Sequence, residues 1–175
     1  MKGIVIEEQD IIKKLYRIGA IGELAQSVEL HPLLAAYLAE KGAITDDNFL
    51  KKAKKSDKLA EDKLAILRHL WSRGYISRLS LEGEDFMRVH RKGIRPGEDR
   101  TQYLVKVIPS SWKPKFSEIM EAIEFAGRLR KELVFAFVEK PEKKPENKEK
   151  TNNENKDKVN EGRIQFVRLG RGTFE

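Results

Sequence analysis

The chain has 175 residues, no cysteine, three histidines and a formal net charge of +7. Its length suits one domain or two small ones. The absence of cysteine excludes disulfides, thiolate zinc sites and thiol nucleophiles, and the histidines show no metal-ligand spacing, so we expect neither a metal nor a cofactor. No apolar run approaches the ~20 residues of a membrane span, and the N-terminal MKGIVIEEQD turns acidic too early for a signal peptide. We therefore expect a soluble, cytoplasmic protein.

A sequence pI of about 9.5 indicates a polyanionic partner such as nucleic acid. A solvated surface rich in lysine and glutamate, as in thermophiles, would give the same charge. The segment 140–162 holds seven lysines and six acids, and Val159 is its only large apolar residue. Such a segment buries too little surface to offset its ordering entropy, so we predict a disordered loop. The basic character then belongs to the rest of the chain.

In the first third of the chain, apolar spacing predicts one strand and three helices: 3–8 as the strand, then helices at 9–16, at 32–42, and after a cap at Thr45 or Asp46. The lysine-rich stretch 51–58 is either a basic helix end or a linker between two small domains.

The remainder predicts a mixed α/β order: a helix at 58–74, strands at 75–81, 85–92 and 102–109, a helix at 116–131, and strands at 132–139 and 162–169. The apolar face of the helix at 116–131 is predicted to contain Phe116, Ile119, Ile123 and Ala126. Trp71 falls in the apolar stripe of the helix at 58–74, so we expect it to pack in the core rather than stack on a base.

Three stretches, taken together, resemble archaeal tRNA-splicing endonucleases: LYRIGAIGE with VELHPLLAAYLAEKGAI, LRHLWSRGYISRLSLEGEDFMRV, and QYLVKVIP with EFAGRLRKELVFAFVE. The resemblance covers the chain except residues 140–160. It implies an α+β fold, with a small mixed α/β N-terminal domain (1–58) and a C-terminal nuclease-like domain (59–175) whose central mixed sheet is flanked by helices. It also implies metal-independent cleavage of precursor tRNA at bulge–helix–bulge junctions, leaving a 2′,3′-cyclic phosphate.

The family's reaction uses a tyrosine as general base, a histidine as general acid and a lysine that stabilises the transition state. By motif spacing these positions fall on Val89, Arg100 and Lys131, and a base-clamping arginine falls on Glu124. Valine cannot accept a proton and arginine stays charged, so only Lys131 keeps its chemistry. The resemblance therefore implies a structural, non-catalytic subunit of a heterotetramer, working with a catalytic endonuclease subunit and precursor tRNA.

Two surfaces follow from this interpretation. The RNA-binding candidates are cations of the nuclease-like domain: Lys131, Arg100, Arg88, Arg91 and Lys92. All of these except Lys131 belong to a longer basic strip that also contains Arg68, Arg73, Arg78 and Arg95. The resemblance places the subunit interface on the last strand and on the acidic loop before it: Ile164, Phe166, Val167 and Leu169, with Glu139, Glu142 and Glu146.

Two alternatives stay open. A one-residue slip, or a β-bulge, would put His90 at the base position, giving an active endonuclease with His90 and Lys131 as its catalytic set. The chain would otherwise be a basic RNA-binding protein unrelated to splicing.

Overall fold

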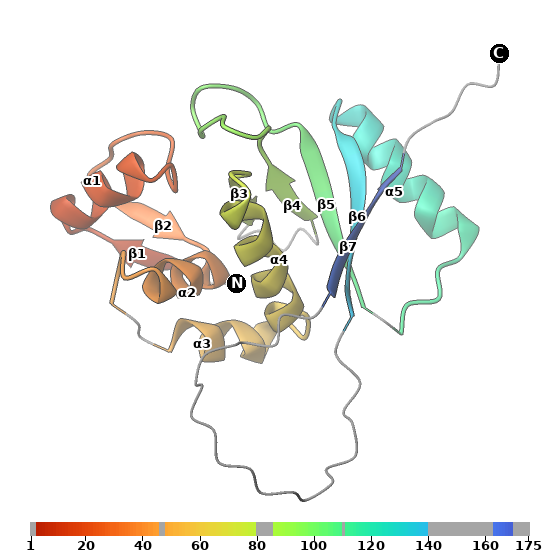
Figure 1. The fold of residues 1–175 in the computed structure, drawn as a ribbon, viewed down its shortest axis with the longest axis horizontal. Helices are drawn as coiled ribbons and strands as arrows, with labels where there is room; N and C mark the ends of the chain where they lie inside the picture. The colour runs from red at the N-terminus through yellow and green to blue at the C-terminus, as the bar shows by residue number, and fades with distance from the viewer. Residues whose placement is uncertain (1–2, 46–47, 80–85, 110, 140–162, 170–175) are drawn as a thin grey trace, which may run out of the picture.

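The computed structural model describes residues 3–45, 48–79, 86–109, 111–139 and 163–169. It shows an α+β protein in which an N-terminal unit lies beside one end of a five-stranded mixed sheet flanked by helices (Figure 1). This confirms the predicted fold class. The predicted disordered loop, with Glu142 and Glu146, falls outside the described residues.

The N-terminal unit is built on a two-stranded antiparallel sheet of β1 (Ile4–Ile6) and β2 (Val28–Leu30). Helix α1 (Gln9–Arg17) lies between these strands in the sequence, and α2 (Pro32–Glu40) follows β2 directly. Strand β2 was not predicted, because three residues are too few to show alternation and its pairing with β1 is not local.

Local chemistry explains where α2 begins and ends. The Nδ1 atom of His31 accepts a hydrogen bond from the backbone N–H of Leu33 at 3.1 Å, so His31 caps the helix, and Pro32 fills the first turn. At the other end Gly42 has φ +65°, in the left-handed region that glycine enters without penalty. The predicted limits of this helix are confirmed.

Helix α3 (Phe49–Ser56) shows that most of the lysine-rich stretch is helical rather than a linker. Its N-cap is Asn48, with φ 54°, so the predicted cap at Thr45 or Asp46 was wrong. Asn tolerates the left-handed conformation better than most residues. The division of the chain at residues 58 and 59 stays a prediction.

The larger sheet has the strand order β3-β4-β5-β6-β7. Its elements are α4 (Ala60–Ser72), β3 (Ser77–Leu79), β4 (Phe86–Val89), β5 (Tyr103–Ile108), α5 (Phe116–Arg128), β6 (Glu132–Glu139) and β7 (Arg163–Leu169). Strands β3, β4 and β5 pair antiparallel, β5 and β6 pair parallel across the α5 crossover, and β7 pairs antiparallel with β6.

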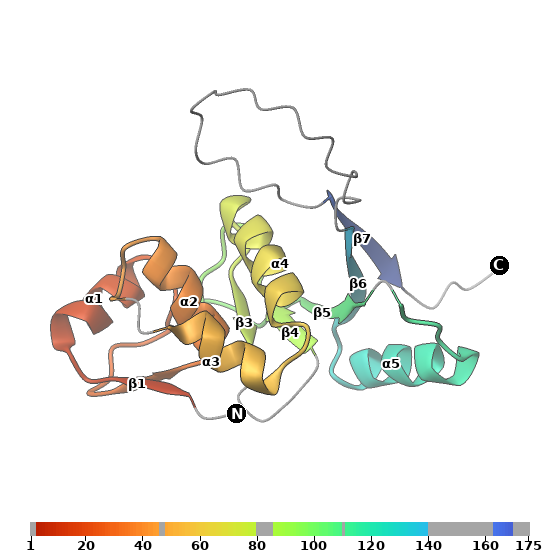
Figure 2. The same ribbon diagram turned by 90° about the horizontal axis from the view of Figure 1, so that it is seen from below.

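Helices α4 and α5 lie on opposite faces of this sheet (Figure 2). Side chains alternate along β5, so that Val105 and Val107 join the core beneath α4 while Leu104 and Ile108 join the core beneath α5. Trp112 packs edge-on against Phe135 in the α5 core, with ring centroids 5.3 Å apart. Phe116 is 77% exposed, so its predicted place on the buried face of α5 was wrong.

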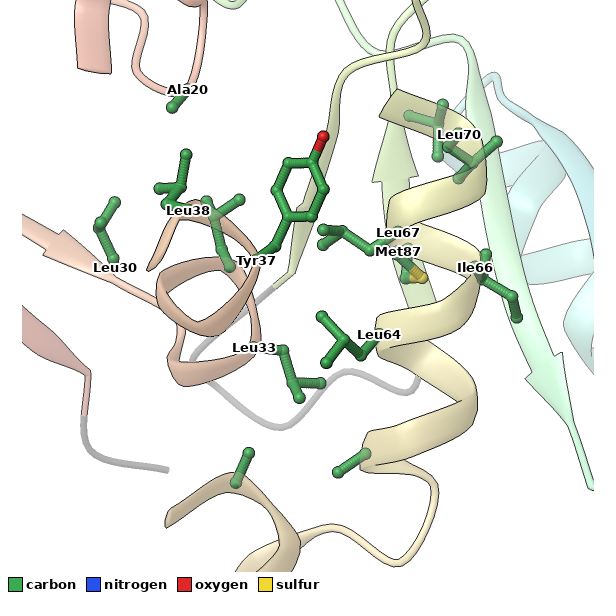
Figure 3. Packing of buried hydrophobic residues seen from close by; sticks show 14 of the residues in the cluster. Ala20, Leu30, Leu33, Tyr37, Leu38, Leu64, Ile66, Leu67, Leu70 and Met87 are labelled. Atoms are coloured by element: carbon green, nitrogen blue, oxygen red, sulfur yellow. The ribbon is translucent and has the colours of Figure 1, made fainter. Parts of the chain in front are cut away.

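The largest hydrophobic cluster joins the N-terminal unit to the sheet (Figure 3). Leu33 and Tyr37 of α2 belong to the same cluster as Leu64 and Leu67 of α4. Trp71 lies 5.1 Å from Tyr37 between ring centroids, as expected for a core tryptophan. In the part of the chain that the structure describes, no helix has the length and apolar content needed to cross a bilayer.

Candidate nucleic-acid interface

Lys131 is placed by the turn that ends α5. The backbone N–H of Lys131 donates to the carbonyl of Ala126 at 2.9 Å, and that of Arg130 donates to the carbonyl of Gly127 at 3.0 Å. These two bonds, with Arg130 at φ 53°, form a Schellman motif. The chain then turns directly into β6, which fixes the backbone of Lys131 beside the start of β5.

The Lys131 side chain reaches the loop that precedes β5. Its Nζ donates to the carbonyl and hydroxyl oxygens of Thr101, at 2.5 and 2.6 Å. Burial, and then the positive charges of Arg88 and Arg100, lower the pKa of Lys131. These electrostatic effects show that the structure brings together Lys131, Arg88 and Arg100, three of the five predicted RNA-binding cations. We call these three residues the cation cluster.

The other two candidates differ in their relation to the cation cluster. The Nη2 of Arg91 donates to Oε1 of Gln102 at 3.2 Å, and Gln102 lies next to Thr101 in the sequence, so Arg91 adjoins the cluster. Lys92 instead packs near Gly74, beyond the end of α4. Two other members of the longer basic strip have partners of their own, since Arg68 forms an ion pair with Glu40 of α2 and Arg73 contacts His69 on α4.

Val89 is 0% exposed and belongs to the core beneath α4, together with Met87. Arg88 lies between them in the strand and is exposed on the opposite face. Strand β4 pairs with β5 residue for residue from Phe86 to Val89, so no bulge interrupts these described pairs. The side chain at the predicted base position therefore points away from the cation cluster.

His90 follows Val89 and is buried, with 3% of its surface exposed. Its backbone N–H donates to the carbonyl of Ile76 at 2.9 Å, and within the described residues neither ring nitrogen has a hydrogen-bond partner. Burial, then the charges of Arg78 and Lys131, lower the pKa of His90, which favours a neutral ring. Lys131 therefore lies near enough to His90 to affect its charge, whereas the side chain of Val89 lies in the core beneath α4.

A cavity of about 760 Å³ lies between the N-terminal unit and the edge of the sheet. Its walls come from three segments: residues 20–34, strands β3 and β4 through Arg78, Leu79 and Arg88, and Gly97 in the loop before β5. Burial lowers the pKa of Arg78, and Glu23 partly opposes this. The sequence indicated Arg78 only as one member of the basic strip, because no local sequence pattern shows that the three segments lining the cavity lie together.

Two of the remaining candidate residues, Glu124 and Glu139, lie on the α5 helix and at the end of β6. Glu124 is exposed on α5, and Glu139, at the end of β6, accepts a hydrogen bond from Nε2 of Gln165 at 2.8 Å. Among the described residues no three His, Asp or Glu side chains gather as they would around a metal ion.

Strand β7 forms one edge of the sheet as described, since its only neighbour in the strand order is β6. Phe166 and Val167 are 36% and 45% exposed, and they point to opposite faces. Phe166 lies 5.3 Å from His69 of α4 between ring centroids. Ile164 and Leu169 are half-buried, so the predicted interface residues share one strand but not one face.

Comparisons with known proteins match this chain to one family. Residues 60–145 match the profile of the tRNA intron endonuclease family, described as its catalytic C-terminal domain. The tRNA-splicing endonuclease of Thermococcus gammatolerans is 27% identical over 142 residues, covering 75% of this chain and 83% of the relative. That of Methanothermobacter thermautotrophicus is 25% identical over 147 residues, covering 79% and 86%.

Proposed function

Because this chain belongs, through residues 60–145, to the tRNA-splicing endonuclease family, we propose that it is a structural, non-catalytic subunit of such an enzyme. In this role it holds precursor tRNA and supports the assembly, while a catalytic subunit cuts at bulge–helix–bulge junctions. The enzyme would act in the cytoplasm.

The observation that carries the proposal is the burial of Val89 at the position where the family's base is expected. A general base must come within hydrogen-bond reach of the 2′-hydroxyl that it deprotonates. The apolar side chain of Val89 cannot accept this proton. Met87, which lies on the same face of β4, is also apolar and buried, so it cannot act as the base instead. Arg100 adds to this, because a guanidinium does not release its proton at neutral pH.

The cation cluster supports the RNA-binding part of the proposal. Arg88 and Arg100 lie close enough to Lys131 to lower its pKa. Such a group of like charges favours an anionic ligand. Phosphate groups of an RNA backbone supply that anion, and each neutralised phosphate releases counterions. Lys131 is anchored on Thr101, a neutral partner, so its charge is not cancelled by a carboxylate there.

The edge position of β7 supports the assembly part. An exposed strand edge offers unpaired backbone groups to a partner strand, and Val167 adds apolar surface beside it. We propose that β7 and Glu139 contact a second subunit, as the family resemblance implies.

One observation favours a second candidate, an active enzyme with His90 and Lys131 as its catalytic set. His90 lies in the field of Lys131, and its lowered pKa would leave it neutral and able to accept a proton. Against this, the described residues bury its ring almost completely. A substrate hydroxyl could reach it only after a rearrangement.

The test uses a bulge–helix–bulge RNA. We expect the purified chain alone to leave it intact, and a mixture with a paralogue carrying tyrosine, histidine and lysine at the three catalytic positions to cut it. Robust cleavage by the chain alone would refute the structural role. His90→Ala then separates the two candidates: unchanged cleavage by the assembled complex excludes His90 as the base, whereas loss of cleavage with the complex still intact supports the active enzyme.

A further inference from the structure

The cavity beside β3 has two chemically different parts. Arg78 and Arg88 are direct partners in the antiparallel β3–β4 pair, so their side chains leave the same face side by side. Both line the cavity. About half of the remaining lining is apolar, and it includes Ala20, Ile21, Val28, Leu30, Leu34 and Leu79. A ligand that fits both parts carries an anionic group next to a flat or apolar one.

Arg78 is the more constrained of the two arginines. Burial disfavours its charged form, and the Glu23 carboxylate offsets this only in part. The Arg78 side chain is nevertheless exposed on β3, so an anion can approach it and form a charge-assisted, bidentate contact.

Two glycines form the rim of the cavity by direct backbone contact. A Cβ atom on Gly97 would meet the carbonyl oxygen of Gly22 at 2.8 Å. A Cβ on Gly22 would lie 3.0 Å from the carbonyl carbon of Pro96 and 3.1 Å from Nη2 of Arg78. The rim is therefore closed by backbone, and the missing side chain at Gly22 leaves the space that the Arg78 guanidinium occupies.

We propose that this cavity binds one nucleotide of an RNA strand, with its phosphate on Arg78 and Arg88 and its base against the apolar wall. Phosphate is the anion that paired guanidiniums recognise best, and a base is a flat group that apolar side chains can cover. Glu23 and Glu29 also line the cavity, and Glu23 lies near Arg78. Their carboxylates accept hydrogen bonds, so they suit a ribose hydroxyl or an exocyclic amino group.

The position of Arg88 indicates that the ligand is an RNA strand rather than a free nucleotide. This residue lines the cavity and also acts on Lys131, so the cavity continues the cation cluster. A backbone lying along Lys131 and Arg88 has its next anionic group within reach of Arg78. This inference rests on the RNA-binding part of the proposed function and adds a second, separate contact to it.

The experiment measures binding of the full chain to a labelled single-stranded RNA of roughly 12 nucleotides by fluorescence anisotropy at several salt concentrations. We expect Arg78→Gln to raise Kd by about fivefold or more and to reduce the salt slope by about 0.7, because one phosphate contact is lost. Arg128→Gln, an equal charge change on exposed α5, is the control and should change Kd by less than about twofold.

A second pair of variants tests the cavity without removing charge. Ser27 is exposed at the cavity lining, so Ser27→Trp should fill the mouth and weaken binding, while Ser117→Trp on α5 should not. Since neither serine is buried, both variants should fold even if Arg78→Gln does not, which circular dichroism checks. The proposal is overturned if Ser27→Trp binds as wild type does, or if folded Arg78→Gln matches Arg128→Gln.

Two further arms identify the ligand. Nucleoside monophosphates should compete with the RNA only weakly, and a mononucleotide that binds more tightly than the strand would overturn the strand assignment. Lys131→Gln is measured in parallel. If it weakens RNA binding while Arg78→Gln has no effect, the cavity proposal fails alone, and if neither has an effect, the RNA-binding part of the proposed function fails as well.

Discussion

The Nζ atom of Lys131 donates hydrogen bonds to both the carbonyl and the hydroxyl oxygen of Thr101, at 2.5 and 2.6 Å. This contact ties the end of α5 to the loop before β5. It also satisfies an ammonium that burial and the neighbouring Arg88 and Arg100 would otherwise disfavour. Because Thr101 is uncharged, this contact does not cancel the charge of Lys131.

Lys131→Gln should weaken RNA binding by the full chain by several-fold and lower the salt slope by about 0.7, since one phosphate contact is removed. Lys113→Gln, at an exposed position before α5, is the matched control and should leave the slope unchanged. Equal slopes for the two variants would show that Lys131 contacts no phosphate.

Arg130→Gly should stabilise the protein by roughly 0.5–1 kcal/mol, because Arg130 adopts φ 53° and glycine enters this region without the Cβ clash. Arg128→Gly, inside the last turn of α5, should instead destabilise it by about 1 kcal/mol. Urea unfolding measures both. A loss of stability in Arg130→Gly would mean that the arginine side chain makes a contact worth more than the backbone strain.

Acid should destabilise the fold through His31. Burial, and to a smaller degree Lys63, lower the pKa of this cap residue from 6.5 to about 4. The unfolded chain then binds more protons than the folded one between these values, so stability is full above the unfolded pKa. As pH falls from the unfolded pKa of 6.5 through the folded pKa of about 4, the protein loses up to about 3 kcal/mol of its free energy of unfolding.

His31→Asn keeps an N-cap but does not titrate, so it should flatten the dependence of unfolding free energy on pH in this window. His90 contributes in the same direction, because its pKa is also lowered, so the slope of His31→Asn should fall without reaching zero. An unchanged slope in His31→Asn would assign the effect elsewhere.

Val167→Lys should reduce assembly with the catalytic partner while leaving the stability of the isolated chain nearly unchanged, because Val167 is 45% exposed on an edge strand. Val5→Lys is the control, since Val5 is 60% exposed on β1, far along the sequence from β7. Mass measurement of the co-purified complex distinguishes them. An intact complex with Val167→Lys would exclude this face of β7 from the interface.

The larger elements could be predicted because their signals are local. Strand β6 (Glu132–Glu139) coincides with a continuous apolar run between two glutamates. Helix α2 has a proline at its start and Gly42 after its end. Strand β2 and the Asn48 cap could not be predicted in this way. One depends on pairing with β1, and the other on a backbone conformation that Asn adopts only in context.

The candidate site was predictable in part for the same reason. Motif spacing singled out Lys131 and Arg100, and Arg88 was named as part of the basic strip. The parallel β5–β6 pair brings Lys131 to the loop that holds Arg100. The face on which Val89 lies follows from strand alternation only once the register of β4 is known. The cavity required three distant segments to meet, which composition and periodicity do not encode.

The shared core of α2 and α4 has a consequence for how the protein unfolds. Tyr37 and Trp71 lie on opposite sides of the predicted domain boundary, yet their rings pack together. Removing either side exposes the apolar face of the other, so the two should melt as one cooperative unit. Trp71 reports on one face of the sheet and Trp112 on the other, so their fluorescence should change at a single midpoint that coincides with the loss of circular dichroism, and a fragment of residues 1–58 should not fold alone.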